Sequence, residues 1–169
     1  MSLPPAPAGW TRFLVKSKFG AGRDFAVSDP ATEQQLYFVD GKFGLQPKAE
    51  IRAVGADLVY RVRGSVLGFP KHMTITDATG AEVGSLRAKT FSPIKSKITL
   101  EMMSGEPWIL EGSFVEKNYT IRSAGRPIVE ISQKWITIKD KYTLDVADGV
   151  DPGLALAVLW SVDRWVERD

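Results

Sequence analysis

The sequence predicts a mostly β protein, a closed antiparallel barrel of about twelve strands around a central hydrophobic C-terminal α-helix. Apolar and polar residues alternate with period two over most of the chain, as they do in strands with one buried face. Turn residues such as Asp40-Gly41 and Ser104-Gly105 separate these runs at hairpin spacing. Residues 152–167 predict a helix that is apolar on every side, and such a helix is either buried or spans a membrane.

The strands follow one another along the chain, and their apolar positions show which face is buried. Neighbouring polar residues such as Arg61 and Arg63 then face outward, because successive side chains of a strand point to opposite sides. The positions predicted to face the core are Phe25/Val27, Leu58/Tyr60/Val62, Met73/Ile75, Ile98/Leu100/Met102, Tyr119/Ile121 and Tyr142/Leu144/Val146.

A weak internal repeat gives the strand number. Bulky apolar residues recur at intervals of 24, 24, 24, 23 and 21 residues, and each is followed by the next apolar strand. Six units of strand, turn and strand imply about twelve strands. Alternatively, the regularity is only that of hairpins in any β-meander, which also leaves an all-β body. The repeated residues are Phe19, Phe43, Leu67, Phe91, Phe114 and Trp135.

The predicted helix begins with Asp151 as its N-cap and Pro152 at the first helical position. Sixteen residues cover roughly 24 Å, less than the ~30 Å hydrocarbon core of a bilayer. Asp163 and Arg164 also interrupt the apolar run. A barrel of about twelve strands leaves room for a helix of ~10 Å diameter, so we expect the helix to fill the barrel. Any ligand is then expected on the outside or at a barrel mouth.

Composition favours one cytoplasmic domain. The 169 residues contain no cysteine, which excludes disulfides and thiolate chemistry, and the net charge of +2 gives no reason to expect nucleic acid. Residues 1–9 contain three prolines and no secretory signal, so we expect a disordered lead-in before a single domain at 10–169.

Basic residues recur in pairs at positions i and i+2, which share one face of a strand. The densest group is Arg87, Lys89, Lys95 and Lys97, on either side of an apolar turn. If these strands form a hairpin, the four cations make one patch for the phosphate head group of an anionic phospholipid or phosphoinositide. The alternative is a solvated outer face whose lysines prevent edge pairing. The other pairs are Lys16/Lys18, Arg61/Arg63 and Lys139/Lys141.

Acidic residues gather before the helix, where Asp145, Asp148 and Asp151 offer carboxylates to calcium. The alternative is a turn at Asp148-Gly149 followed by the helix cap, and the spacing differs from that of an EF-hand loop. His72 is the only histidine, without a nucleophile elbow or partners for a zinc site. We therefore predict no catalytic residue, no metal site and no cofactor.

The layout of the whole chain resembles the LURP-one-related proteins, which share a fold superfamily with the Tubby C-terminal domain and the phospholipid scramblases. The resemblance extends from about Arg12 to Trp165 and is carried by the order of hairpins, the Lys134-Trp135 step, the Asp145-Val146-Ala147-Asp148-Gly149 segment and the apolar terminal helix. It implies a twelve-stranded barrel around a central helix.

For function, the resemblance suggests phosphoinositide binding through basic residues, as in Tubby domains, but no residue-by-residue match supports that site here. The sequence therefore predicts a non-enzymatic binding module in the cytoplasm, peripheral at a membrane through anionic lipid. The alternative is a soluble scaffold or protein-interaction domain without a lipid ligand.

Overall fold

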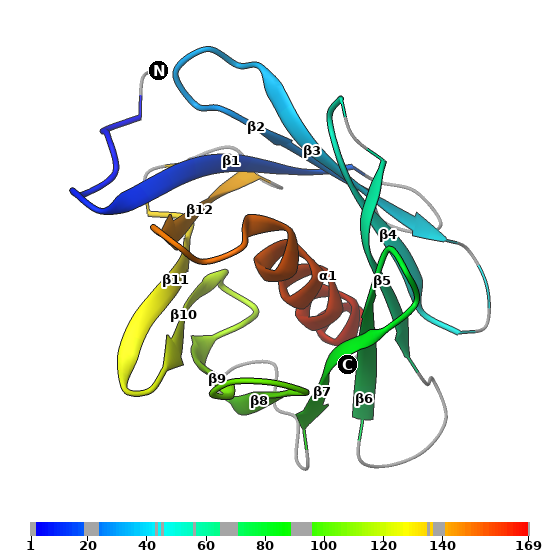
Figure 1. Ribbon diagram of the computed structural model, residues 1–169. Coiled ribbons are helices and arrows are strands. Elements are labelled where there is room, and N and C mark those ends of the chain that lie inside the picture. The colour runs from blue at the N-terminus through cyan, green and yellow to red at the C-terminus, as the bar shows by residue number, and fades with distance from the viewer. Residues whose placement is uncertain are drawn as a thin grey trace.

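The strands close into one antiparallel barrel around a helix, which confirms the predicted fold class. The computed structural model describes residues 3–18, 24–42, 44, 46–55, 57–64, 71–88, 96–134, 136 and 141–168. Each strand pairs with its neighbours in sequence, and the first strand, β1, also pairs with the last, β12. Figure 1 looks along the barrel and shows the helix α1 enclosed by the strands.

The described elements are twelve strands and one helix. They run in the order β1 (Trp10–Lys18), β2 (Asp24–Ser28), β3 (Gln35–Lys42), β4 (Lys48–Ala53), β5 (Leu58–Gly64), β6 (Lys71–Asp77), β7 (Glu82–Ala88), β8 (Ser96–Met102), β9 (Trp108–Ser113), β10 (Asn118–Ser123), β11 (Arg126–Ser132), β12 (Lys141–Ala147) and α1 (Pro152–Arg168).

Alternation along the strands produces the core as the sequence predicts. In β2 the burial pattern alternates between intermediate and buried, with Phe25 and Val27 inaccessible to solvent. Five of the six predicted repeat positions, residues 19, 43, 67, 91 and 135, lie outside the described residues. The sixth, Phe114, is fully buried and packs edge-on against Tyr119, with ring centroids 4.9 Å apart.

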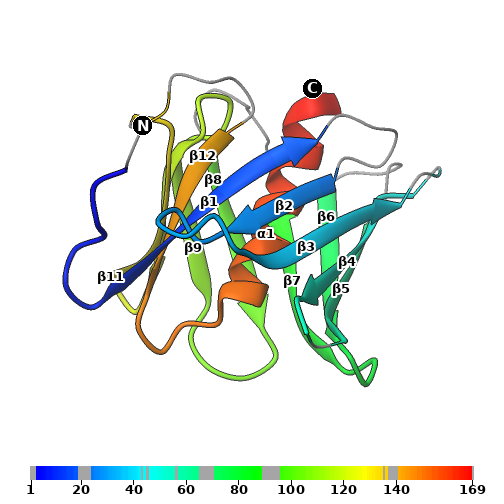
Figure 2. The ribbon, with the colours of Figure 1, turned by 90° about the horizontal axis from the view of Figure 1, so that it is seen from above.

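The interior of the barrel is filled by α1, whose residues from Gly153 to Asp163 are all buried. Trp160, the largest of the fully buried side chains, is only 1% exposed. Figure 2 shows the helix running along the inside of the barrel, with its C-terminal turn at one end. Among the described residues, no helix is long and apolar enough to cross a bilayer.

Polar contacts hold α1 near both of its ends. At the N-terminus the Asp151 carboxylate accepts a hydrogen bond from the backbone N–H of Gly153 at 2.8 Å, which confirms the predicted cap. The Tyr60 hydroxyl of β5 donates to the other carboxylate oxygen. Burial and this hydrogen bond raise the pKa of Tyr60. Towards the C-terminus, Lys117 in the turn between β9 and β10 forms an ion pair with Asp163.

The segment before β1 lies against the outside of the barrel. The backbone carbonyl of Pro7 accepts from the Trp10 N–H at 3.1 Å, and that of Gly9 accepts from the Asp148 N–H at 2.9 Å. The carbonyl of Pro4 accepts from the Arg12 guanidinium at 2.6 Å. These bonds place the proline-rich segment beside β1 and β12.

Candidate functional site

A hollow of about 810 Å³ lies on the outer face of β3 to β6. Its volume is in the range of small-ligand sites, about 300–1,000 Å³. We call it the basic hollow, because its ionisable side chains are the cations Lys42, Lys48, Arg61 and Arg63, with His72 and one carboxylate, Glu50.

Strand register brings three of these cations side by side. Lys48 of β4 stands directly opposite Lys42 of β3 and also directly opposite Arg63 of β5. Residues directly opposite in antiparallel strands share a face, with their Cα atoms about 5 Å apart. Like charges in this position destabilise strand pairing. Strand pairing therefore does not explain why these three cations stand side by side. Adjacent cations of this kind are expected where a protein binds an anion from the solvent.

The carboxylate of the basic hollow is surrounded by cations. Glu50 lies 3.0 Å from Arg52, 3.3 Å from Lys42 and 3.6 Å from Arg61. The hydrogen bond from Arg52, followed by that from Lys42, lowers the pKa of Glu50 despite partial burial. Lys42 also contacts Asp40 at 2.6 Å, and this hydrogen bond raises the pKa of Lys42. The cations around Glu50 are thus paired with carboxylates of the protein itself.

The other side of the hollow keeps its charge free for a ligand. Within the described part of the chain, neither Lys48 nor Arg63 forms an ion pair, and both side chains are exposed. Arg61, although it lies 3.6 Å from Glu50, keeps about half of its side-chain surface exposed, 49%. An arginine presents N–H groups in a planar fork that matches phosphate oxygens, and a lysine adds a point charge. This arrangement can hold a phosphate group from the solvent side.

The predicted cation patch continues the hollow along the barrel. Arg87 of β7 stands directly opposite His72 of β6, which lines the hollow. Lys97 of β8 faces the same way and lies 3.9 Å from Glu111 of β9. Lys89 and Lys95, the other two predicted residues, lie outside the described residues. The structure thus places Arg87 and Lys97 on the outer faces of adjacent strands.

Sequence reasoning missed Lys42, Lys48 and His72 as members of one site. Lys42 and Lys48 do not form an i, i+2 pair, and they meet only because β3 and β4 pair in this register. The turn predicted at Asp40-Gly41 gave no help, because the structure places both residues inside β3, and the strand ends at Lys42. His72 is an exposed residue of β6 that lines the hollow.

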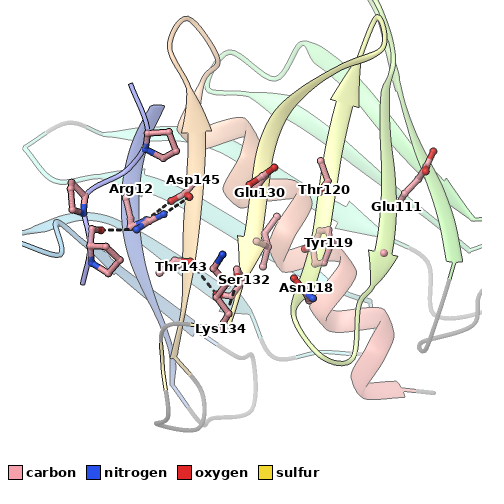
Figure 3. Close-up of a pocket in the computed structure, with 15 residues that line it drawn as sticks. Arg12, Glu111, Asn118, Tyr119, Thr120, Glu130, Ser132, Lys134, Thr143 and Asp145 are labelled. Carbon is pink, nitrogen blue, oxygen red and sulfur yellow. Dashed lines mark hydrogen bonds and ion pairs between the residues drawn. The ribbon is translucent and has the colours of Figure 1, made fainter. Parts of the chain in front are cut away.

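A second hollow of about 620 Å³ lies on the outer face of β9 to β12 and β1. We call it the proline-edged groove, because Pro4, Pro5 and Pro7 line one side of it. Figure 3 shows charged residues crossing these strands in one row. Direct pairing sets the row, which runs Arg12, Asp145, Glu130, Thr120, Glu111 and Lys97.

Arg12 and Asp145 form the strongest contact of this groove. The Arg12 Nε and terminal N–H groups donate to the two Asp145 oxygens at 2.8 and 2.9 Å, and both side chains are about nine-tenths buried. This bidentate hydrogen bonding raises the pKa of Arg12. The ion pair joins the first strand to the last and is partly covered by the proline-rich segment.

The three aspartates before the helix do not assemble into a calcium site. Asp145 is bound to Arg12, Asp151 caps the helix, and Asp148 is exposed in the intervening turn. In the described ranges, no group of three or more acidic or histidine side chains is placed to hold a metal ion. The turn-and-cap interpretation explains Asp148 and Asp151.

Comparison with known proteins agrees with this architecture. A model of the LURP-one-related family matches residues 11–163. An X-ray structure of an Arabidopsis thaliana protein is similar, with a TM-score of 0.64 and 13% sequence identity over 92% of this chain and 91% of that chain. At this identity the likeness shows the fold alone. A search of curated proteins gave no match.

Proposed function

Because the chain belongs to the LURP-one-related family, with its barrel closed around the helix, we propose that it is a non-enzymatic module that binds anionic phospholipid. The phosphate head group is held in the basic hollow by Lys48, Arg61 and Arg63. The observation that carries this proposal is the set of three directly opposed cations, Lys42, Lys48 and Arg63. Like charges in this position destabilise strand pairing, and among the described residues no carboxylate forms an ion pair with Lys48 or Arg63.

The position of the hollow suits a peripheral membrane protein. The helix occupies the lumen, so the outer surface is where a ligand is expected. Each cation near an anionic membrane contributes about 1 kcal/mol, and this attraction is screened beyond the Debye length. Arg87 and Lys97, with Lys89 and Lys95 as their predicted companions, extend the cation set along the barrel and are proposed to contact neighbouring head groups.

The direct test is co-sedimentation with vesicles of phosphatidylcholine alone, with phosphatidylserine, or with phosphoinositide, across a salt series. We expect binding that requires anionic lipid and weakens as salt rises. The double variant Arg61→Gln/Arg63→Gln should bind anionic vesicles roughly 30-fold more weakly, since two cations are lost at about 1 kcal/mol each.

The matched control is Arg122→Gln/Arg126→Gln, two exposed arginines of β10 and β11 outside the hollow. It removes the same charge and should keep the affinity of the native chain. Equal weakening by both double variants would show that only net charge matters. Absence of binding to every vesicle would instead favour a soluble protein-interaction domain.

A further inference from the structure

Although the net charge is only +2, positive and negative side chains gather towards opposite ends of the barrel axis. Neighbouring antiparallel strands run in opposite directions, so odd-numbered strands finish, and even-numbered strands begin, at the same end. Cations stand at these positions on β1, β4, β5, β7, β8 and β12, at an end that we call the basic end: Lys16, Lys48, Arg63, Arg87, Lys97 and Lys141.

The other end, the acidic end, carries the opposite charge. Carboxylates stand where even-numbered strands finish and odd-numbered strands begin, at Asp29, Asp57, Asp77, Glu82, Glu106 and Asp148. The separation is strong without being complete. Carboxylates also lie at or near the basic end, and cations at or near the acidic end. The carboxylates near the basic end are Asp24, Asp40, Glu50, Glu111, Glu116 and Glu130, and the cations near the acidic end are Arg12, Arg52, Arg122 and Arg126.

The helix dipole does not explain the cations of the basic end. The C-terminus of α1 points to this end, and a cation there is favourable, but the effect is confined to the last turn. The cation that contacts the helix near this end is Lys117, which forms an ion pair with Asp163. By contrast, Lys16 of β1 and Lys141 of β12 stand on the outer face, directly opposite one another, where like charges disfavour pairing.

We propose that the protein docks on an anionic bilayer end-on, with the basic end against the membrane and the acidic end away from it. This inference rests on the proposed function, because it takes the partner to be anionic lipid. Cations of β1, β7, β8 and β12, together with those of β4 and β5, then reach one flat surface. A single head group in the basic hollow uses only those of β3 to β6.

Screening favours this orientation over a side-on one. A seven-residue strand such as β7 is about 20 Å long, which is two Debye lengths at 0.1 M salt. End-on docking therefore keeps the carboxylates of the acidic end beyond the range of repulsion. Docking on the side of the basic hollow would instead bring Asp77, at the end of β6, and Glu82, at the start of the adjacent β7, towards the same bilayer.

The absence of native cysteine allows the orientation to be measured with single labels. Asn118 is exposed at the basic end of β10, across the barrel from the hollow, and Ala78 is exposed in the turn after β6 at the acidic end, on the side of the hollow. Fluorophores at Asn118→Cys and Ala78→Cys are read on phosphatidylserine vesicles that contain a lipid-borne quencher.

End-on docking predicts quenching of the label at position 118 and not of that at position 78. Quenching at position 78 without quenching at position 118 would overturn the inference and leave the proposed function intact. Vesicle binding in which neither label is quenched would also overturn it.

A second arm separates the inference from the proposed function. Lys16→Gln/Lys141→Gln lies outside the basic hollow and should weaken binding to phosphatidylserine vesicles roughly 30-fold. Binding of soluble inositol trisphosphate, which tests the hollow alone, should be unchanged. If this variant binds vesicles like the native chain while Arg61→Gln/Arg63→Gln does not, the inference is wrong and the proposed function stands. The reverse result would overturn the hollow as the head-group site and, because Arg63 also stands at the basic end, would overturn docking by the whole end as well.

Discussion

In the basic hollow, cations of three neighbouring strands face one another, whereas the proline-edged groove is crossed by three carboxylates, with Arg12 at one end of the row and Lys97 just beyond the groove at the other. Both hollows lie on the outer face of the same barrel and have comparable volumes, about 810 and 620 Å³. In the groove, Arg12 and Asp145 satisfy each other and are partly covered by the chain itself. In the groove the most buried charges, Arg12 and Asp145, are paired with each other, whereas in the hollow Lys48 and Arg63 are exposed and form no ion pair among the described residues.

The largest loss of stability is expected when the buried Arg12–Asp145 ion pair of the proline-edged groove is broken. Arg12→Ala leaves the Asp145 carboxylate nearly buried without its bidentate partner, and we expect a loss of about 3 kcal/mol in the free energy of unfolding. Chemical denaturation at neutral pH measures this loss. Arg63→Ala, the matched change in the hollow, should cost about 0.5 kcal/mol or less. Equal losses in the free energy of unfolding for the two variants would show that the groove and the hollow do not differ in how their charges support the fold.

A smaller effect of opposite sign is expected in the hollow. Lys48→Glu places a carboxylate between Lys42 and Arg63, which should raise the free energy of unfolding by about 0.5 kcal/mol through opposite-charge pairing. The same variant should bind anionic vesicles more weakly. Denaturation and co-sedimentation on one preparation check both parts, with Lys48→Gln as the control for side-chain length. A destabilised variant with unchanged vesicle binding would mean that Lys48 serves the fold.

The smallest effect concerns pH and Glu50. Because the pKa of Glu50 is lowered in the folded protein, its stabilising contribution is present above the ordinary carboxyl pKa of 4.5 and is lost as pH falls through the lower folded value. The pair is partly solvated, so this contribution is about 0.5 kcal/mol or less. Protonation also removes the one carboxylate of the hollow. Thermal unfolding of the native chain and of Glu50→Gln between neutral pH and the acid range should differ only at the upper end of that range.

The sequence predicted the fold well because the relevant signals are local. Period-two burial in strands such as β2 and the all-round apolar character of α1 can each be recognised within a short window of residues. The cap at Asp151 was equally local, since its partner is the N–H of Gly153. The predicted cation patch was local too, and this is why it included Arg87 and Lys97 and omitted Lys48.

The candidate site depends on contacts between strands, which the sequence pattern did not reveal. Arg12 and Asp145 are 133 positions apart, and they meet because the barrel closes between β1 and β12. Periodicity indicates which side of a strand a residue faces. It does not indicate which residue of the next strand lies opposite, because register depends on turn geometry and on closure of the whole sheet.

The sequence pattern and the tertiary structure thus determined different properties of this protein. By itself the sequence determined the strands, the buried helix and the outward direction of the cations, because burial of apolar side chains has a period that the backbone fixes locally. Only the tertiary structure decided that Lys42, Lys48 and Arg63 adjoin and that the charges separate between the two ends of the barrel. Electrostatic sites are built from distances in space, and antiparallel pairing sets those distances.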